Sequence, residues 1–153
     1  LAYGNANSIA GGKTPLSSMS PSIVLKDKKP YLAIGSAGGP RIITGTLQGI
    51  INAIDFDMNP EQLVNAPYVN CLTREQGLEA EFGISQDTLR LLEERGHKPV
   101  CIEADQAMST MVNSVMLKDG EYYAAGTKRV DGCGGVLLSN GNIILEGISQ
   151  EIS

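Results

Sequence analysis

The sequence predicts a mixed α/β (α+β) fold in which most strands are antiparallel. Turn signals at residues 27–30, 118–121 and 139–142 lie between short apolar runs, a pattern that is typical of β-hairpins. Residues 40–54 and 85–95 carry the start and stop signals of helices. Helices and antiparallel strands in one short chain indicate helices that pack on a sheet.

The composition limits the classes of function. With 153 residues, of which 42% are hydrophobic, the chain suffices for a single domain over residues 1–153 with an aliphatic core. The formal net charge of −5 argues against a nucleic-acid partner, because phosphate binding requires clustered Lys and Arg. No apolar run is long enough to cross a bilayer, so we expect no membrane span in this chain.

We expect neither a metal nor another cofactor. Cys71, Cys101 and Cys133 lack the spacing of metal ligands and are expected to be small, buried or partly exposed thiols, and a single histidine adds too few ligands. The motif Gly12-Lys13-Thr14 is similar to the end of a P-loop. A P-loop also requires a glycine five positions before Gly12, but Asn7 occupies that position, so we do not expect a nucleotide site.

The first elements are a hairpin and a helix. Residues 22–26 and 31–36 are expected to form the two strands, and a helix follows from Pro40, whose fixed φ suits a first helical position. The larger apolar residues of this helix recur on one face, at Ile43, Leu47, Ile50, Ile51 and Ile54. A row of small residues beside that face would let the helix approach a sheet closely, namely Gly45, Gly49 and Ala53.

The remaining elements are shorter. Asn59 is expected to cap a helix that ends at Asn65, with Gln62 completing a capping box. Ser85 is expected to cap another helix, which runs to Arg95 and stops at Gly96. Strands are expected at residues 68–72, 78–82, 100–103, 111–117, 122–125, 136–138 and 143–145.

Two pairs of adjacent residues form the candidate site. Ser17 and Ser18 precede the first hairpin strand, and Gly38 and Gly39 follow the second. Serines are common in turns, and a glycine pair suits a tight turn with positive φ, so each pair alone has a structural explanation. A hairpin places its two ends side by side, so the hydroxyls and the glycine amides are expected to lie close together. Such donors at a helix start suit a carboxylate or an oxyanion.

The same stretches carry a resemblance to a known family. Pro15-Leu16-Ser17-Ser18-Met19-Ser20-Pro21 and Gly35-Ser36-Ala37-Gly38-Gly39-Pro40-Arg41-Ile42 resemble the C-terminal part of the small subunit of the γ-glutamyltranspeptidase family. The resemblance covers most of the chain, from about Gly4 to Gly135, and continues through Thr46-Leu47-Gln48, Ile54-Asp55, Asn65-Ala66-Pro67 and Arg95-Gly96-His97-Lys98. It implies the α-β-β-α sandwich of N-terminal-nucleophile hydrolases, of which this chain would be one portion.

The resemblance also implies an activity. Enzymes of this family cleave γ-glutamyl amides such as glutathione and transfer the γ-glutamyl group to water or an amino acid. Ser17 and Ser18 match the serines that hold the substrate α-carboxylate, and Gly38 and Gly39 match the glycines of the oxyanion hole. The family's nucleophile is an N-terminal Thr whose own amine takes the proton, so His97 is not needed as a base. No residue before Ser17 matches that Thr, and the isolated chain is therefore expected to be inactive.

The resemblance implies partners as well. The γ-glutamyl substrate would bind together with the remainder of the small subunit and the large subunit, which would supply the Thr, an acidic residue for the substrate amine and an arginine. Strand edges exposed in an isolated chain can also pair with a second copy. A periplasmic, secreted or cell-surface location is implied, and a cytoplasmic one is also open.

Two other functions stay open. One is a related amidase, such as a cephalosporin or glutaryl acylase, and the other is a non-catalytic binding or assembly domain.

The chain departs from the family pattern in three places. These are Thr127-Lys128-Arg129, where Asp-Pro-Arg is common, Tyr68, where Arg is usual, and residues 138–153. These departures leave the subgroup and the acceptor open.

Overall fold

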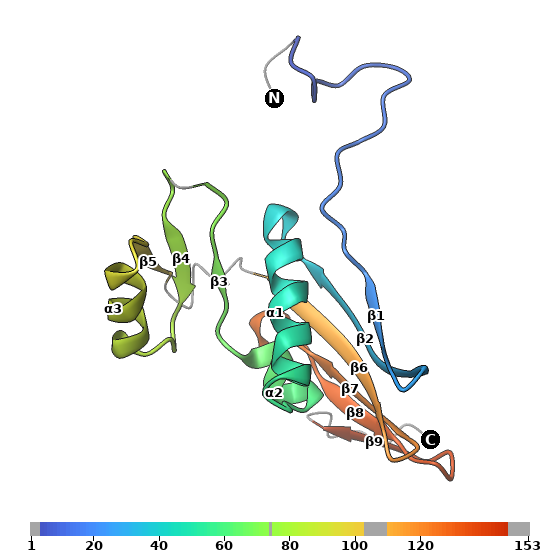
Figure 1. Cartoon of the computed structure of the whole chain (residues 1–153). Helices are drawn as coiled ribbons and strands as arrows, with labels where there is room; N and C mark the ends of the chain where they lie inside the picture. The colour runs from blue at the N-terminus through green and yellow to red at the C-terminus, as the bar shows by residue number, and fades with distance from the viewer. Residues whose placement is uncertain (1–3, 74, 103–109, 147–153) are drawn as a thin grey trace.

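The chain forms two sheets and three α-helices over residues 4–73, 75–102 and 110–146, which the computed structural model describes (Figure 1). The larger sheet has six strands in the order β1-β2-β6-β7-β8-β9, and all neighbours are antiparallel. Its strands are β1 (Ser22–Lys26), β2 (Lys29–Ala37), β6 (Met111–Lys118), β7 (Glu121–Gly126), β8 (Gly134–Leu137) and β9 (Ile143–Glu146). The three predicted hairpins are confirmed, because β1-β2, β6-β7 and β8-β9 each pair directly.

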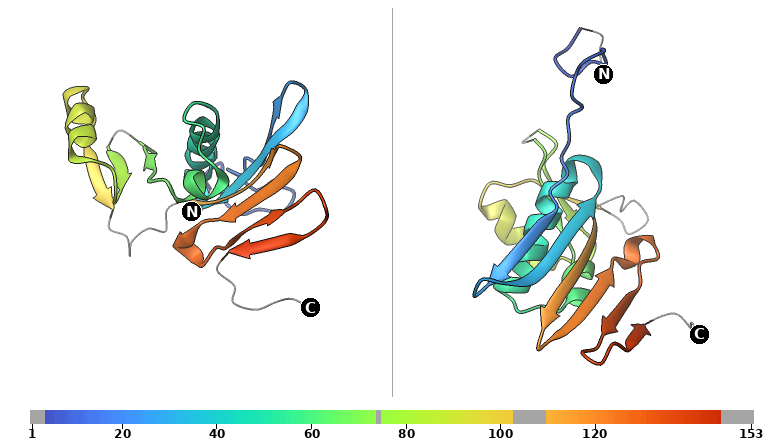
Figure 2. Two further views of the ribbon diagram at one scale, coloured as in Figure 1. Left: turned by 90° about the horizontal axis from the view of Figure 1, so that it is seen from below. Right: turned by 90° about the vertical axis from the view of Figure 1, so that its right-hand side faces the viewer.

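Two helices cover one face of this sheet (Figure 2). A 3₁₀ turn, η1 (Gly39–Arg41), leads into α1 (Ile42–Ile54), and α2 (Pro60–Asn65) follows. The predicted capping box of α2 is confirmed, because Gln62 N donates to Asn59 Oδ1 and Asn59 N donates to Gln62 Oε1. The core lies between these helices and the sheet and contains Leu32, Ile34, Ala53, Leu63, Val64, Tyr68, Val112, Met116 and Ala125. None of the described helices has the length and apolar character needed to cross a membrane.

Helix α1 packs on the sheet through its small residues. Gly45, Gly49 and Ala53 are buried, and a Cβ added to Gly49 would lie 2.5 Å from Ile34 Cδ1. The predicted close approach of helix and sheet is therefore confirmed. The apolar stripe beside it does not form this contact: Ile43, Leu47 and Ile54 are all exposed. The small-residue row therefore faces the sheet, Ile50 packs against the edge of the core, and Ile43, Leu47 and Ile54 face outward.

Substitution of Gly45 by alanine is expected to destabilise the chain by roughly 1–3 kcal/mol, the usual cost of overpacking. The new Cβ would lie 1.7 Å from Thr110 Cγ2, so the helix or the strand must shift. Gly35→Ala in β2 is the control, because a Cβ there meets no atom within 4 Å. Urea unfolding measures both, and equal losses in the two variants would contradict the proposed packing.

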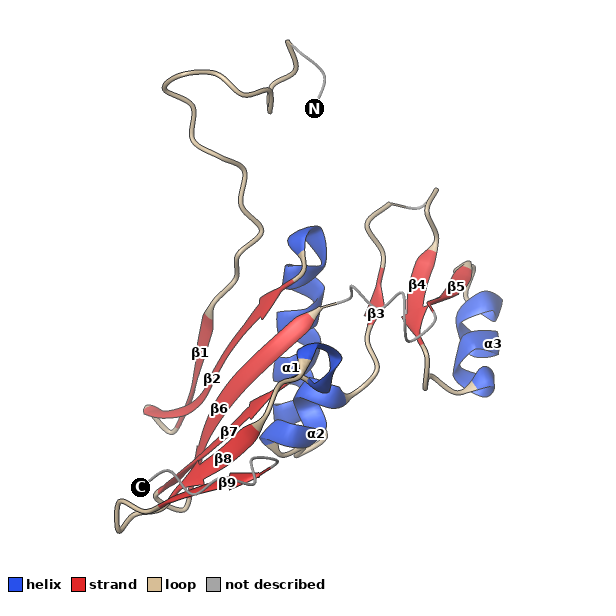
Figure 3. Ribbon diagram, turned by 180° about the vertical axis from the view of Figure 1, so that it is seen from behind, coloured by secondary structure: helices blue, strands red, loops and turns tan. Residues whose placement is uncertain are grey.

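The smaller sheet lies on the other side of α1 (Figure 3). It consists of β3 (Val69–Asn70), β4 (Leu78–Glu81) and β5 (Pro99–Ile102); β3-β4 is antiparallel and β4-β5 is parallel. Helix α3 (Gln86–Glu94) makes the crossover that a parallel pair requires. Its predicted N-cap is confirmed, because Ser85 Oγ accepts a hydrogen bond from Thr88 N. The predicted last residue of β5, Glu103, lies outside the described residues.

The strand predicted over residues 68–72 is shorter in the structure, where only Val69 and Asn70 pair with β4. Tyr68 is instead part of the core. Its hydroxyl donates to Leu63 O at 2.7 Å, and its amide donates to the carboxylate of Glu81 at 3.0 Å. The backbone of Tyr68 stays beside β4, because its carbonyl accepts a hydrogen bond from Glu81 N at 3.0 Å, while its buried ring and satisfied hydroxyl stabilise the core.

The face of the six-stranded sheet opposite the helices carries a band of small and apolar residues, many of them exposed. The strand register aligns one residue from each strand in a row across this face, namely Ile23, Ala33, Val115, Ala124, Gly135 and Leu145. Ile23, Val115 and Leu145 are among the exposed large hydrophobic residues. Within the described part of the chain, no helix or second sheet covers this face (Figure 2).

Candidate active site

The β1-β2 hairpin brings the serine pair and the glycine pair to the same end of the sheet. The pairing of β1 with β2 starts at Ser22 and Ile34, with the serines shortly before it and the glycines just beyond the end of β2. Ser17 Oγ accepts a hydrogen bond from Met19 N at 3.2 Å. Among the described residues, no hydrogen bond joins the serines to the glycines.

The glycine pair forms the turn that leads into the helix. Gly38 has φ 138° and Gly39 has φ 59°, backbone angles that residues other than glycine rarely adopt. The carbonyls of both residues accept hydrogen bonds from the following turn, from Arg41 N and Ile42 N. Neither glycine amide donates a hydrogen bond within the described residues. A Cβ on Gly39 would meet no atom within 4 Å, so the turn faces open space. Two unpaired N–H groups before a helix can bind an anionic oxygen.

An ion pair fixes the end of this turn. Arg41 donates to Glu79 of β4 through Nε to Oε2 at 2.7 Å and through Nη2 to Oε1 at 2.6 Å. Asn70 Nδ2 donates to Glu79 as well, and Thr44 Oγ1 donates to Asn70 Oδ1. The hydrogen bond from Arg41 holds the pKa of Glu79 below its ordinary value and raises the pKa of Arg41. These contacts connect the glycine turn to the smaller sheet.

The ion pair between Arg41 and Glu79 should make the stability of the fold depend on pH. Because the pKa of Glu79 is lower in the folded chain than in the unfolded one, the pair stabilises the fold above the ordinary carboxyl pKa of about 4.3. That contribution is lost as the pH falls through the lower folded value. Glu79→Gln should therefore be less stable than the wild-type chain at neutral pH, and the difference should shrink in acid. Urea unfolding at several pH values measures this difference in stability, with Glu93→Gln on the exposed side of α3 as control. A difference between Glu79→Gln and the wild-type chain that stays constant with pH would contradict the lowered pKa of Glu79.

Gln48 of α1 holds the smaller sheet by mimicking a strand. Its side-chain Nε2 donates to Val69 O at 2.7 Å, and Val69 N donates to Gln48 Oε1 at 3.0 Å. One side-chain amide thus satisfies both backbone groups of a residue in β3. Gln48 therefore has a structural role that accounts for it without any contact to substrate.

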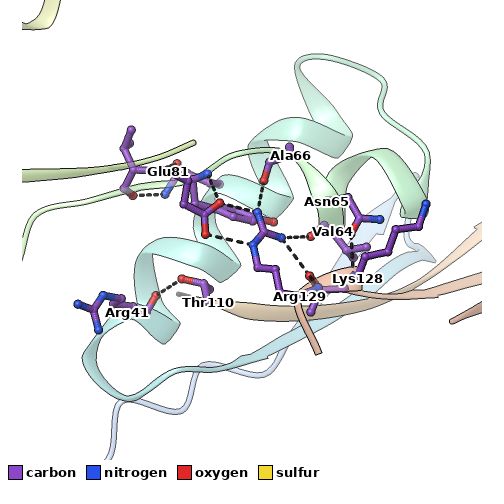
Figure 4. Close-up of polar contacts among 12 residues, drawn as sticks. Arg41, Val64, Asn65, Ala66, Glu81, Thr110, Lys128 and Arg129 are labelled. Carbon is purple, nitrogen blue, oxygen red and sulfur yellow. Dashed lines mark hydrogen bonds and ion pairs between the residues drawn. The ribbon is translucent and has the colours of Figure 1, made fainter. Parts of the chain in front are cut away.

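A buried arginine makes the second connection to the smaller sheet (Figure 4). Arg129 donates to both carboxylate oxygens of Glu81, and also to Val64 O, Ala66 O and Thr127 Oγ1. The two side chains are only 13% and 8% exposed, respectively. All three guanidinium nitrogens have acceptors, so Arg129 is held in the fold and is not placed to bind substrate.

Tyr68 lies against this arginine, with its ring centroid 5.2 Å from Arg129 Cζ. Burial raises the pKa of Tyr68, so its hydroxyl stays neutral and keeps its hydrogen bond to Leu63. Tyr68, which stands where the family usually has Arg, is therefore a core residue in this chain. Lys128, which belongs to the stretch that differs from the family's Asp-Pro-Arg, pairs with Glu61 at 2.6 Å on the surface.

The other candidate residues form no site of their own. His97 is exposed, and its amide donates to Leu92 O just beyond α3. The three cysteines are free thiols, and all three are exposed, so none is the buried thiol that the sequence left open. Sequence reasoning assigned no role to Arg41, Gln48, Glu79, Glu81 and Arg129. Arg41, Gln48 and Arg129 belong to stretches quoted above, so a sequence signal existed for them. None existed for Glu79 and Glu81, which lie far from their partners in the sequence.

Comparison with solved structures defines the fold class. A mutant of γ-glutamyltranspeptidase from Helicobacter pylori superposes with a TM-score of 0.72 and 38% sequence identity, over 84% of this chain and 70% of that chain. The predicted fold class, mixed α/β with mostly antiparallel strands as in the N-terminal-nucleophile hydrolases, is therefore confirmed.

Sequence comparison defines the family. A family model described as gamma-glutamyltranspeptidase matches residues 2–136, and the chain belongs to this family. The glutathione hydrolase proenzyme of Escherichia coli (strain K12) is 43% identical over 129 residues, which is 84% of this chain and 22% of that protein. The acylase ACY 1 proenzyme of Pseudomonas sp. (strain SE83) is 36% identical over 129 residues, which is also 84% of this chain and 22% of that protein. The chain thus spans about a fifth of the length of these relatives.

Proposed function

We propose that this chain supplies the oxyanion hole and the carboxylate-binding serines of a γ-glutamyltransferase/hydrolase. The observation that carries the proposal is the Gly38-Gly39 turn, whose two N–H groups have no partner among the described residues and precede α1. Ser17 and Ser18 would bind the substrate α-carboxylate at the same end of the β1-β2 hairpin. The substrate class would be γ-glutamyl amides such as glutathione.

The reaction would be acyl transfer through a covalent intermediate. A threonine in the part of the protein outside these residues would attack the γ-carbonyl carbon, while its hydroxyl proton passes to its own α-amine. The carbonyl oxygen then becomes negatively charged and accepts hydrogen bonds from Gly38 N and Gly39 N. The C–N bond breaks, the amine leaves with the proton, and water or an amino acid releases the γ-glutamyl group from the threonine ester.

Serine substitutions test the assignment of the carboxylate site. In the longer protein, Ser17→Ala and Ser18→Ala are each expected to raise KM for a γ-glutamyl anilide by roughly 10- to 150-fold, since a hydrogen bond to a charged group contributes about 1.5–3 kcal/mol. Ser139→Ala, in the turn before β9, is the control. An unchanged KM in both serine variants would remove these residues from the substrate site.

A related amidase is the second candidate, and the likeness to acylase ACY 1 favours it. Glutaryl groups lack the α-amine of γ-glutamyl groups but keep a carbonyl for the oxyanion hole. Comparing the hydrolysis of γ-glutamyl and glutaryl anilides by the longer protein separates the two enzymes. Hydrolysis of neither would favour a non-catalytic binding or assembly domain.

A further inference from the structure

The Gly38-Gly39 turn has no side chains of its own, so the direction of its two N–H groups depends on the residues around it. Gly38 has φ 138° and Gly39 has φ 59°, and a Cβ on Gly39 would meet no atom within 4 Å. Glycine has the most conformational freedom of all residues, whereas an oxyanion hole requires donors that are already in place before the reaction. Contacts that hold this turn still are therefore part of the candidate site.

The backbone of Arg41 fixes one of the two donors. Arg41 N donates to Gly38 O at 3.2 Å. The peptide group that carries this carbonyl also carries the N–H of Gly39, and because the group is planar and trans, the two bonds point in opposite directions. The hydrogen bond from Arg41 therefore sets the direction of the Gly39 N–H, and a rotation of Arg41 would turn this donor.

Arg41 is held at its side chain and at its carbonyl by a ring of hydrogen bonds. Its guanidinium donates to Glu79 through Nε at 2.7 Å and through Nη2 at 2.6 Å, and Asn70 Nδ2 donates to Glu79 Oε2 at 2.8 Å. The Thr44 hydroxyl lies 2.8 Å from Asn70 Oδ1 and 3.0 Å from Arg41 O, and its proton closes the ring. Thr110 Oγ1 donates to the same carbonyl of Arg41 at 3.5 Å (Figure 4).

Glu79 connects this ring to the smaller sheet. It lies on β4, and its carboxylate accepts both bonds from Arg41 and the bond from Asn70. The side chains of Arg41 and Glu79 are 28% and 22% exposed, and an ion pair that reaches solvent adds only modestly to stability. A pair with two parallel hydrogen bonds fixes direction as well as distance. Its main effect is therefore on the orientation of residue 41.

We propose that Glu79 is a positioning residue for the oxyanion turn: its carboxylate holds Arg41, and Arg41 in turn directs the Gly39 N–H. This inference rests on the proposed function of the Gly38-Gly39 turn. Glu79 acts through Arg41 and has no part in holding the substrate. Its loss should therefore weaken an interaction that forms in the transition state, which lowers kcat and leaves KM almost unchanged.

Substitutions of Glu79 in the longer protein test the effect on catalysis. Glu79→Gln is expected to lower kcat for a γ-glutamyl anilide by roughly 10- to 100-fold, because a small misplacement of a catalytic group costs up to about 100-fold. Glu79→Asp keeps the carboxylate and should retain more activity than Glu79→Gln. Glu61→Gln on α2 is the matched control, because it also breaks an ion pair of 2.6 Å, that with Lys128. Circular dichroism establishes that each variant is folded.

Arg41→Lys is the second variant, in case Glu79→Gln does not fold. Lysine keeps the positive charge but lacks the two parallel donors of the guanidinium, so the same loss of kcat is expected.

The direction of the Gly39 N–H can be measured without any catalysis. Its residual dipolar coupling, recorded by NMR on this chain after isotope labelling, reports the orientation of that bond. We expect the coupling to change in Glu79→Gln and to stay the same in Glu61→Gln. This measurement separates the positioning role from the proposed reaction, because it does not depend on a substrate.

Three outcomes would overturn the proposal. They are an unchanged coupling of the Gly39 N–H in Glu79→Gln, a rise in KM without a loss of kcat, and an equal loss of kcat in Glu61→Gln. A changed coupling together with full activity of Gly39→Ala would have a different meaning. Glu79 would then still direct the turn, and it is the proposed function of the turn that would fail.

Discussion

Alanine at position 39 is expected to lower kcat of the longer protein by roughly 100- to 1,000-fold, the usual cost of disturbing one oxyanion-hole donor. Gly39 has φ 59°, which an alanine adopts only with strain, so the turn would relax and redirect the N–H groups of residues 38 and 39. The added Cβ would also occupy the open space in front of the turn, where the proposed substrate carbonyl would lie. Steady-state kinetics with a γ-glutamyl anilide measures the loss.

Gly120→Ala separates this effect from a general loss of stability. Gly120 has φ 84°, and a Cβ there also meets no atom within 4 Å, but the residue lies in the β6-β7 turn. Both substitutions are expected to cost about 1–2 kcal/mol of folding free energy, because each forces alanine into a left-handed conformation. Only Gly39→Ala should affect kcat. Equal kinetic losses, or full activity of Gly39→Ala, would exclude this turn from the reaction.

Replacement of Arg129 by methionine is expected to destabilise the chain by roughly 3–5 kcal/mol, the cost of breaking a buried ion pair from one side. Glu81 would keep a buried carboxylate without its cation, and the carbonyls of Val64 and Ala66 would lose their shared donor. A residue that bound substrate would instead affect KM and leave stability unchanged. Unfolding in urea measures the difference.

Arg90→Met is the control for Arg129→Met, which breaks the buried pair with Glu81. Arg90 and Asp87 pair at 3.5 Å on the exposed side of α3, and such surface pairs contribute at most about 1 kcal/mol. Adding Glu81→Leu to Arg129→Met should recover part of the lost stability, because the unpaired carboxylate is then removed. Similar losses in the Arg90 and Arg129 variants would show that the buried network contributes little.

The local elements could be predicted from the sequence because their signals are local. The Asn59 capping box, the Ser85 cap and the strand over residues 22–26 depend on neighbours a few positions away, and all three are confirmed. The hairpin between the serine pair and the glycine pair was predictable in the same way, and it places both pairs at the same end of the sheet. The roles of Ser17, Ser18, Gly38 and Gly39 remain predictions.

The rest depends on contacts between distant residues. Helical spacing shows that Ile43, Leu47 and Ile54 share a face, but it does not show that these three side chains remain exposed while the small-residue row meets the sheet. The separate sheet of β3, β4 and β5 is held by side chains that reach it from distant positions, namely Arg41, Gln48 and Arg129. Such pairings leave no periodic pattern in the sequence.

The uncovered apolar face of the large sheet has a consequence for how this chain behaves in solution. A partner that binds only the folded chain raises its stability by RT ln(1 + [L]/Kd), about 2.7 kcal/mol when the partner is present at 100 times Kd. The row that includes Ile23, Val115 and Leu145 offers such a partner exposed apolar side chains on every second strand or so across the sheet. The melting temperature of this chain should therefore rise with the concentration of any partner that binds this face of the folded chain.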